Sequence, residues 1–358
     1  LAFNQDAIDL HKTNLKENTL IIYDSARVQL DGLSQSTVIA LNVREILEAA
    51  GASPAMDRFC LIGALCRALQ IDFVFLEELI LKFDVESAEL KLRTARMGYD
   101  QARPVDTLQP LAQPVLPALN GCQAMGLGLL KAGMQAYIGY PMTPVSPLLE
   151  LFAGLEPEFG LHVLLPESEI AVMLSALGYS YMGVKNAVGT SGGGFSLMVE
   201  GLGLAGQAEL PVVVVMAQRS GPSTGMPTYT AQTDLHFVLH AGHGEFPRLV
   251  VAPGDADEAY YWAGVAMNKA WYYQMPAFIL VDRTVCLNMY SFDSQSVPEL
   301  EDEPPILWQG PGRYQRYQKT ENGVSPLAFP PLPGQAVKTN SYVHDEYGVV
   351  SENPAIAK

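Results

Sequence analysis

The sequence predicts an α/β protein whose central part, residues 119–284, is a doubly wound domain with a mainly parallel sheet. Strand-length and helix-length segments alternate regularly along this part of the chain. Strand candidates such as Pro211–Ala217 are apolar almost without interruption, which is typical of strands that helices cover on both faces.

The predicted elements follow one another in a simple order. Helix-length stretches, such as Glu169–Gly183, Phe195–Glu209 and Asp255–Tyr273, lie between most of the strand candidates. In sheets of this kind ligands bind where loops leave the carboxyl ends of the strands, so functional residues are expected in those loops. The strand candidates are Gln135–Tyr140, His162–Leu165, Lys185–Thr190, Pro211–Ala217, Arg248–Ala252 and Pro276–Val281.

Three further regions flank this domain. Residues 1–103 contain a short apolar run at Thr19–Tyr23, helical spacing from Asp72, and mixed charges over Glu86–Arg96 that predict an exposed helix. Residues 285–358 lack periodicity and are expected to form a connector towards a further domain that is not present. Since the chain begins at Leu1 without Met, we interpret it as part of a longer protein. Residues 104–118 predict an extended linker, because they hold few charges and four prolines, Pro104, Pro110, Pro114 and Pro117.

Composition narrows the possible functions. The 358 residues are 49% hydrophobic and 17% charged, which allows a large core. The formal net charge of −16 would repel phosphate backbones, so nucleic-acid binding is not expected. No apolar run approaches the ~18 residues of a membrane span and the start does not resemble a signal peptide, so a cytoplasmic location is expected.

Four cysteines, Cys60, Cys66, Cys122 and Cys286, are scattered along the chain without a C-x-x-C pair. This chain alone is therefore not expected to hold an iron–sulfur cluster or a zinc ribbon. Buried free thiols in a reducing compartment are the expected state.

The first strand-end loop, Gly139–Pro147, is stiffened by prolines and presents Thr143 just before a helix. The Thr143 hydroxyl could serve a site or cap that helix. The next such loop carries Glu167 and Glu169 on either side of Ser168. Both acids suit a helix N-terminus, and either could instead be held at the strand end to share a proton with a cofactor nitrogen.

The third loop is glycine-rich, Gly189-Thr-Ser-Gly-Gly-Gly-Phe-Ser, and lies between a strand and a helix. Such a turn could cradle a phosphate with backbone N–H groups. It does not match the dinucleotide fingerprint, because Leu197 stands where the third glycine belongs. Close approach of the backbone to a ligand or partner is what the glycines indicate.

The fourth loop, Gln218–Gln232, is longer than a connection needs, which favours a function. Its one cation, Arg219, could bind a carboxylate or hold the loop in place. The histidines that follow, His236, His240 and His243, lack a metalloprotease-type spacing, so a polar loop is preferred to a metal site.

Taken together, these loops resemble the alpha subunit of 2-oxoacid:ferredoxin oxidoreductases of the 2-oxoglutarate type. Order and spacing agree over about residues 120–350, and residues 1–103, with Ala2-Phe-Asn-Gln-Asp-Ala, look like the later part of the family's gamma domain. The matching stretches are Gly139-Tyr-Pro-Met-Thr-Pro, Glu167-Ser-Glu-Ile-Ala, Thr190-Ser-Gly with Gly194-Phe-Ser-Leu-Met, Gln218-Arg with Gly221-Pro-Ser-Thr-Gly, Gly242-His-Gly-Glu-Phe-Pro-Arg, Tyr314-Gln-Arg-Tyr with Gly323-Val-Ser-Pro, and Val343-His-Asp-Glu-Tyr-Gly.

The resemblance implies a pyrimidine-binding domain for thiamine diphosphate. That cofactor is the electron sink when a 2-oxoacid is oxidatively decarboxylated to an acyl-CoA and the electrons pass to ferredoxin or a similar acceptor. Glu169, with Glu167 second, matches the glutamate that hydrogen-bonds a pyrimidine ring nitrogen, and Thr143 matches the residue that approaches the substrate. The other expected cofactor contacts are Ser191, Gly192, Gly193, Tyr140 and Pro141, and the other expected substrate contacts are Arg219 and Tyr229.

The family's Mg²⁺–diphosphate motif, G-D-G followed by Asn, is not matched by Gly254-Asp255-Ala256. The resemblance therefore implies that a beta subunit carries the diphosphate and Mg²⁺, that iron–sulfur clusters belong to partner chains, and that the protein is an oligomer. No metal site is expected on this chain.

Other stretches depart from the family's pattern. Its Asn-Glu-Ala near the domain start is Cys122-Gln-Ala here, and its Ser-Gly-Pro-Gly is Ser191-Gly-Gly-Gly. Its Pro-Thr-Arg-Thr-Glu-Gln is Pro227-Thr-Tyr-Thr-Ala-Gln, so Tyr229 replaces an arginine and Ala231 a glutamate. Two other functions stay open on these grounds, namely a nucleotide- or phosphate-binding regulatory or assembly subunit, and a scaffold that has lost the chemistry.

Overall fold

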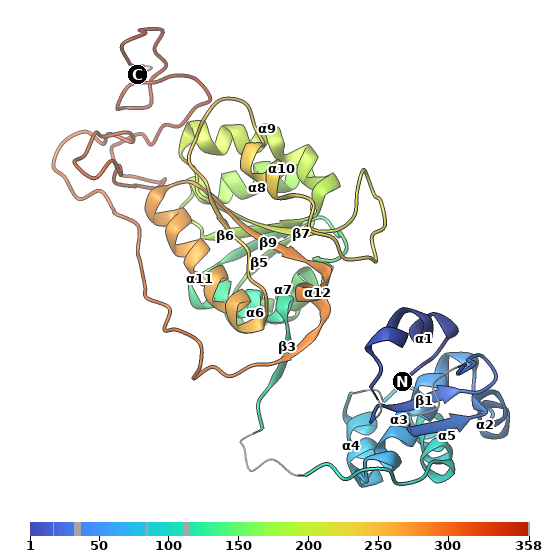
Figure 1. The fold of residues 1–358 in the computed structure, drawn as a ribbon. Coiled ribbons are helices and arrows are strands. Elements are labelled where there is room, and N and C mark those ends of the chain that lie inside the picture. Colours follow the sequence, from blue (N-terminus) through green and yellow to red (C-terminus); the bar gives the residue numbers. More distant parts are fainter. Residues whose placement is uncertain (17, 32–36, 84, 110–114, 357–358) are drawn as a thin grey trace. The chain divides into compact units, whose positions relative to one another are not determined.

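A computed structural model describes residues 1–358 apart from 17, 32–36, 84, 110–114 and 357–358 (Figure 1). The chain forms two compact units, Leu1–Pro114 and Val115–Lys358, which are described separately. The boundary falls inside the stretch predicted as a linker, and two of its four prolines, Pro110 and Pro114, lie outside the described residues.

The first unit is a small α/β body. Its strands β1 (Leu20–Asp24) and β2 (Thr37–Leu41) pair in parallel, and β1 corresponds to the strand predicted at Thr19–Tyr23. The remaining elements are α1 (Gln5–His11), η1 (Lys12–Asn14), α2 (Val43–Ala50), η2 (Pro54–Met56), α3 (Asp57–Ala68), α4 (Phe73–Phe83) and α5 (Ala88–Gln101).

The helix predicted as exposed over Glu86–Arg96 is not fully exposed in the structure. It begins at Ala88, and its residues Ala95 and Gly98 are buried against α3. A Cβ added at Gly63 of α3 would overlap the Ala95 carbonyl, and one added at Gly98 would overlap the Cys60 carbonyl. Glycines thus let the backbones of α3 and α5 touch. The charged residues of α5 alone do not indicate this close packing.

The second unit contains a six-stranded sheet in the order β5-β4-β6-β7-β9-β8, with every neighbouring pair parallel. The strands are β4 (Ala136–Gly139), β5 (His162–Leu164), β6 (Asn186–Thr190), β7 (Val212–Gln218), β8 (Leu249–Val251) and β9 (Pro276–Asp282). Each coincides with a predicted strand. Its helices are α6 (Gly121–Lys131), α7 (Ser146–Phe159), α8 (Glu169–Tyr181), α9 (Gly192–Ala208), α10 (Leu235–His240), α11 (Ala256–Tyr273) and α12 (Arg283–Leu287).

Helices cover both faces of this sheet, as Figure 1 shows, which confirms the doubly wound α/β fold. Helices α6, α7 and α11 pack with one set of strand side chains, and α8, α9 and α10 pack with the other set. Strand β7 shows why its sequence is apolar throughout: Val213 and Val215 belong to the first core, whereas Val212 and Val214 belong to the second. Burial of each such side chain contributes about 1.5–3 kcal/mol.

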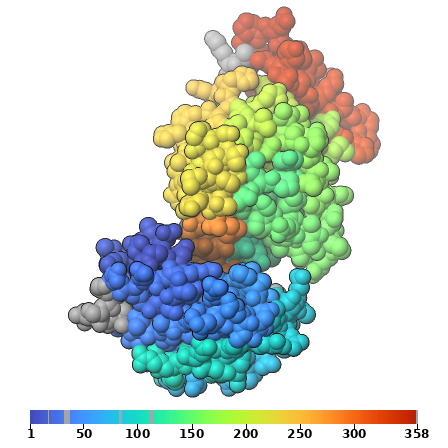
Figure 2. All heavy atoms as spheres, turned by 90° about the vertical axis from the view of Figure 1, so that its right-hand side faces the viewer, coloured from blue at the N-terminus to red at the C-terminus, as the bar shows by residue number. Residues whose placement is uncertain are grey.

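The chain after residue 285 packs against the second unit rather than leaving it. A short strand β10 (Met289–Ser291) pairs antiparallel with β3 (Ala118–Asn120). Further on, the Arg316 side chain is 2% exposed and donates to the Glu209 carbonyl at 2.7 Å. Tyr181 donates to the Val337 carbonyl at 2.9 Å. Figure 2 shows the last part of the chain, in red, lying against the green part of the second unit. The predicted connector is therefore fixed to the domain along much of its length.

Among the helices that the structure describes, none combines the length and the apolarity that crossing a membrane requires.

Candidate active site at the carboxyl edge of the sheet

Four loops meet at the carboxyl edge of the sheet. Strands β5, β4, β6 and β7 are consecutive neighbours and run in the same direction, so the loops that follow them leave from the same edge. The order reverses around β4: the chain moves out to β5 and then returns to β6 on the other side. This is the switch point at which ligands bind in doubly wound sheets. Thr143 and Arg219 lie on the loops after β4 and β7, and Glu169 begins the helix after β5.

Glu169 is the first residue of α8, and its side chain is only 4% exposed. Ser168 caps the helix by accepting a hydrogen bond from the Ala171 N–H at 3.5 Å. Glu167 is exposed. The Glu169 Oε1 atom is buried and has no hydrogen-bond partner among the described residues. A buried carboxylate oxygen without a hydrogen-bond donor is costly, so a ligand that donates a hydrogen bond to this atom would stabilise it.

The glycine turn lies directly against this carboxylate. A Cβ built on Gly194 would be 2.5 Å from Glu169 Oε1 and would overlap the Thr190 hydroxyl. Only glycine fits there, which gives the glycine-rich turn a packing role that the sequence did not reveal. Gly194 is also the third residue of α9. The Glu169 carboxylate thus sits beside a helix N-terminus, where the helix dipole favours negative charge.

Arg219 links two of the loops. The residue is 9% exposed, and its Nη1 donates to the Thr143 carbonyl at 2.8 Å. The Nε atom is buried and unpartnered in the described part of the protein. Thr143 does not cap α7, which begins at Ser146 without a side-chain cap. Its hydroxyl is therefore not committed to that role.

A cavity of about 410 Å³ opens beside Arg219. It is lined by the start of α9, including Ser191, Gly192 and Gly193, and by Asp234 and the turn at Ser223. The Ser191 hydroxyl is buried and lacks a partner among the described residues. The residues that line the cavity thus hold three buried polar atoms without partners among the described residues, Ser191 Oγ, Arg219 Nε and Asp234 Oδ2.

Asp234 is a cavity residue that the sequence did not single out. Burial raises the pKa of its carboxyl. Its backbone N–H donates to Gln218 Oε1 at 3.0 Å, which brings the far end of the long loop back to the end of β7. Its own position in the chain carries no local motif, so only the folded loop places it in the cavity.

Three other predicted contacts lie on exposed parts of the same loops. Tyr229 is 61% exposed and is not among the residues that line this cavity. Tyr140 is 40% exposed, and Pro141 is also exposed. All three are at the carboxyl edge, but within this chain they are surface residues.

Metal and thiol chemistry find little support among the described residues. The described residues contain no group of three or more His, Cys, Asp or Glu side chains arranged to hold a metal ion. His236 and His240 stack with ring centroids 6.0 Å apart. All four cysteines are buried and free, and burial raises the pKa of Cys60 to about 12. Such thiols are poor nucleophiles and metal ligands.

Comparison with known proteins gives a consistent result. Residues 127–356 match the family described as "Pyruvate flavodoxin/ferredoxin oxidoreductase, thiamine diP-bdg". The 2-oxoacid:ferredoxin oxidoreductase subunit alpha of Saccharolobus solfataricus is 36% identical over 288 residues, which is 74% of this chain and 44% of that protein. The 2-oxoglutarate synthase subunit KorA of Methanocaldococcus jannaschii is 38% identical over 167 residues, 47% of this chain and 46% of that protein.

A solved structure is also similar. The 2-oxoglutarate:ferredoxin oxidoreductase from Magnetococcus marinus, with 2-oxoglutarate, coenzyme A and succinyl-CoA bound, superposes with a TM-score of 0.85 at 29% identity. The match covers 99% of this chain and 64% of that one. The chain thus spans less than half the length of the two curated relatives described above.

The resemblance to 2-oxoacid:ferredoxin oxidoreductase alpha subunits is confirmed, whereas the 2-oxoglutarate type and the gamma-domain assignment of residues 1–103 stay predictions. The alternative of a nucleotide-binding regulatory subunit gains no support from these relatives. Since the family match extends over residues 127–356, well over half of the chain, the protein belongs to the thiamine-diphosphate-binding pyruvate flavodoxin/ferredoxin oxidoreductase family.

Proposed function

We propose that this chain forms part of the alpha subunit of a 2-oxoacid:ferredoxin oxidoreductase that converts a 2-oxoacid and coenzyme A to an acyl-CoA. We further propose a 2-oxoacid of the 2-oxoglutarate class, which the names of the similar proteins suggest. The observation that carries the proposal is the buried Glu169 carboxylate, with its unpartnered Oε1 at the switch point of the sheet.

The residues at this edge fit the aminopyrimidine of thiamine diphosphate. A protonated ring nitrogen would supply the donor that Glu169 Oε1 lacks, and Gly194 keeps the space above the carboxylate free of a side chain. Ser191, with its unpartnered hydroxyl, and the backbone at Gly192 and Gly193 are the further contacts we propose. Tyr140 and Pro141 complete the set. When bound, the cofactor supplies a carbon nucleophile and an electron sink for decarboxylation.

The chain's own residues then have distinct tasks. Glu169 would share a proton between Oε1 and the ring nitrogen, a general acid–base role for which its burial beside a helix N-terminus fixes its position. Arg219 braces the Thr143 loop through the Thr143 carbonyl and keeps Nε available for a substrate carboxylate. Thr143 and Tyr229 are the remaining substrate contacts in this proposal.

We propose that the Mg²⁺–diphosphate half of the site lies on a beta subunit. Asp255, the one acid of the incomplete Gly254-Asp255-Ala256 motif, is occupied as the N-cap of α11. It accepts from the Glu258 N–H at 2.9 Å, while Glu258 accepts from the Gly254 N–H at 2.8 Å. A carboxylate engaged in this way is a structural cap rather than a metal ligand.

The wider assembly is part of the same proposal. We place the iron–sulfur clusters on partner chains, ferredoxin as the electron acceptor, and the complex in the cytoplasm as an oligomer. Residues 1–103 would be the later part of a gamma domain, residues 104–118 its linker, and residues 285–358 the connector that follows the cofactor domain.

The test compares the chain alone with its complex. The complex with a beta subunit should reduce ferredoxin or a viologen dye when given 2-oxoglutarate, coenzyme A, thiamine diphosphate and Mg²⁺. The chain alone should be inactive and should show no micromolar, Mg²⁺-dependent binding of the cofactor by calorimetry. Tight binding by the isolated chain would contradict the shared site, and a complex inactive with every 2-oxoacid tried would contradict the function.

A further inference from the structure

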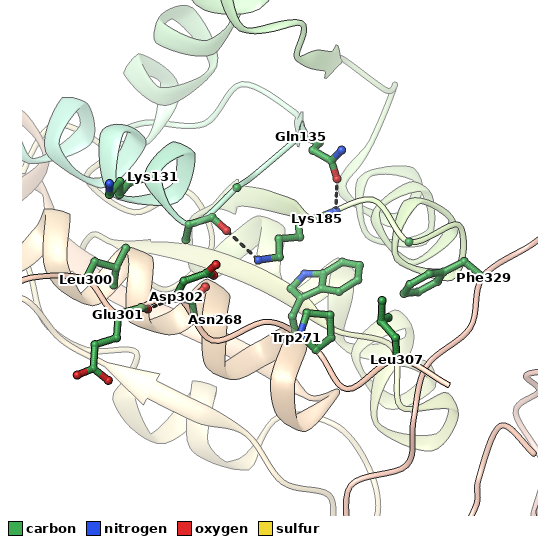
Figure 3. Close-up of a pocket in the computed structure, with 14 residues that line it drawn as sticks. Lys131, Gln135, Lys185, Asn268, Trp271, Leu300, Glu301, Asp302, Leu307 and Phe329 are labelled. Carbon is green, nitrogen blue, oxygen red and sulfur yellow. Dashed lines mark hydrogen bonds between the residues drawn. The ribbon is translucent and has the colours of Figure 1, made fainter. Parts of the chain in front are cut away.

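The opposite, amino edge of the sheet holds a cavity of about 560 Å³ (Figure 3), a size that suits a small molecule. Lys185 stands immediately before β6 and Gln135 immediately before β4, which fixes the cavity at the start of these strands. The ends of α6 and α11 form further parts of its wall. The other lining residues are Gly183, Leu300, Glu301, Asp302, Pro305, Leu307 and Phe329. The cavity shares no residue with the loops described above.

Two fully buried side chains of α11 have unfilled hydrogen-bonding groups in this wall. Asn268 is 3% exposed, and its Oδ1 has no partner among the described residues. Trp271 is 1% exposed, and its indole Nε1 likewise lacks an acceptor there. The two residues are three apart on the helix, so they share a face. Since buried polar groups are normally paired, one free acceptor and one free donor indicate a ligand.

A cation and an anion stand beside these groups. The Lys185 ammonium donates to the Ala132 carbonyl at 2.9 Å, which leaves N–H groups for a ligand. Burial lowers the pKa of Lys185, while the charge of Asp302 raises it. Figure 3 shows Lys185, Asp302 and the indole of Trp271 gathered around one part of the cavity, with the Glu301 carboxylate turned away. This part of the cavity thus carries one charge of each sign.

The remaining wall is mixed, with Lys131 and Gln135 on its polar side and an apolar part near Trp271. Leu300, Pro305, Leu307 and Phe329 line the apolar part, and the Phe329 ring lies 6.2 Å from that of Trp271 between centroids. A ligand therefore needs a hydrophobic part as well as its polar groups.

We propose that this cavity binds a zwitterionic α-amino acid with an apolar side chain. The carboxylate would accept from Lys185 and from Trp271 Nε1, and the ammonium would donate to Asp302 and to Asn268 Oδ1. A simple anion would meet the Asp302 carboxylate, and a simple cation would meet the Lys185 ammonium. A ligand that carries both charges satisfies all four groups. The proposal rests on the cavity alone and does not depend on the reaction at the carboxyl edge.

Calorimetry on the full chain tests the ligand class. L-leucine is the probe, and its two halves are the controls: 4-methylpentanoate, which has only the carboxylate, and 3-methylbutylamine, which has only the ammonium. Leucine should bind saturably, and each half should bind about tenfold more weakly or worse, because it loses a charge-assisted pair. Equal binding of leucine and either half would overturn the zwitterion. Absence of saturable leucine binding up to ~1 mM would also overturn the proposal.

Variants test the location. Asp302→Asn should weaken leucine binding about tenfold, whereas Glu301→Gln, next to it in the chain but turned away from the cavity, should leave it unchanged. Both residues are exposed, so both variants should fold. Trp271→Phe keeps a ring but removes the N–H donor and should weaken binding by a similar factor. Unchanged binding in Asp302→Asn would contradict the assigned site.

Discussion

The two edges of the six-stranded sheet differ in how their unpaired polar groups arise. At the carboxyl edge, Glu169 and Arg219 lie on loops that directly follow β5 and β7, and close packing at Gly194 holds the carboxylate in place. At the amino edge, Asp302 and Leu300 join Lys185 and Trp271 because the connector folds back over the start of the strands. One edge is therefore built from local motifs, and the other from long-range packing.

This difference gives the edges separate functional expectations. Changes at the carboxyl edge should alter turnover and leave amino-acid binding intact, because no residue is common to the two sites. A substitution at one edge that altered both turnover and amino-acid binding would show that the two edges are coupled.

The largest expected effect is that of Glu169→Gln. Glutamine keeps the size and one hydrogen-bonding oxygen but cannot exchange the proton, so turnover of the complex should fall ~10²–10⁴-fold. Folding should be unaffected, and so should leucine binding in the cavity at the amino edge. The measurements are steady-state activity and proton exchange at the cofactor's thiazolium C2.

Glu167→Gln is the matched control, because Glu167 is exposed two residues away on the same loop. Its activity should stay near that of the parent. If Glu167→Gln is inactive and Glu169→Gln turns over normally, the assignment of the acid is wrong.

A smaller loss is expected from Gly194→Ala. The new methyl group would lie 2.5 Å from Glu169 Oε1 and overlap the Thr190 hydroxyl, so the carboxylate or the helix must shift. Overpacking of this kind costs about 1–3 kcal/mol. If about 1.4 kcal/mol of that cost falls on the catalytic geometry, kcat should fall roughly tenfold.

Gly203→Ala, in the same helix α9, is the control, because a Cβ there would lie no closer than 3.6 Å to its nearest neighbour, the His243 ring. We expect its activity within roughly threefold of the parent, as for most substitutions that remove no contact. Equal losses in Gly203→Ala and Gly194→Ala would mean that helix rigidity, and not contact with Glu169, explains the loss.

The carboxyl edge could be predicted from the sequence to a large extent. Apolar runs such as Pro211–Ala217 predicted the strands. The order of the loops predicted that Thr143, Glu169 and Arg219 lie at one edge of the sheet. Sequence pattern alone did not separate Glu169 from Glu167. The resemblance favoured Glu169, and the structure adds a physical distinction, because Glu169 is buried and Glu167 is exposed.

The parts that were missed depend on contacts between distant residues. Asp234 enters the cavity because Gln218 binds its backbone across the long loop. The amino-edge cavity requires residues 300–307, which have no periodicity and no motif. Likewise, the exposure of Tyr229 follows from how its loop folds, with Gly225 in a left-handed conformation (φ +55°), and not from its residue type.

The smallest expected effect concerns substrate choice at Tyr229, which is 61% exposed on the carboxyl-edge loop. An arginine at this position would offer a bidentate, charge-assisted contact to a second carboxylate, whereas tyrosine offers one neutral O–H and an apolar ring. Exchanging a neutral for a charge-assisted bond changes binding by about 1–2 kcal/mol, roughly tenfold in discrimination. Tyr229→Arg should therefore raise kcat/KM for 2-oxoglutarate relative to an apolar acid such as 2-oxoisovalerate. Tyr229→Phe, which removes only the O–H, should shift the ratio much less. If the parent complex already prefers 2-oxoglutarate and Tyr229→Arg leaves the ratio unchanged, the second carboxylate is held elsewhere, with Arg219 Nε the next group to test.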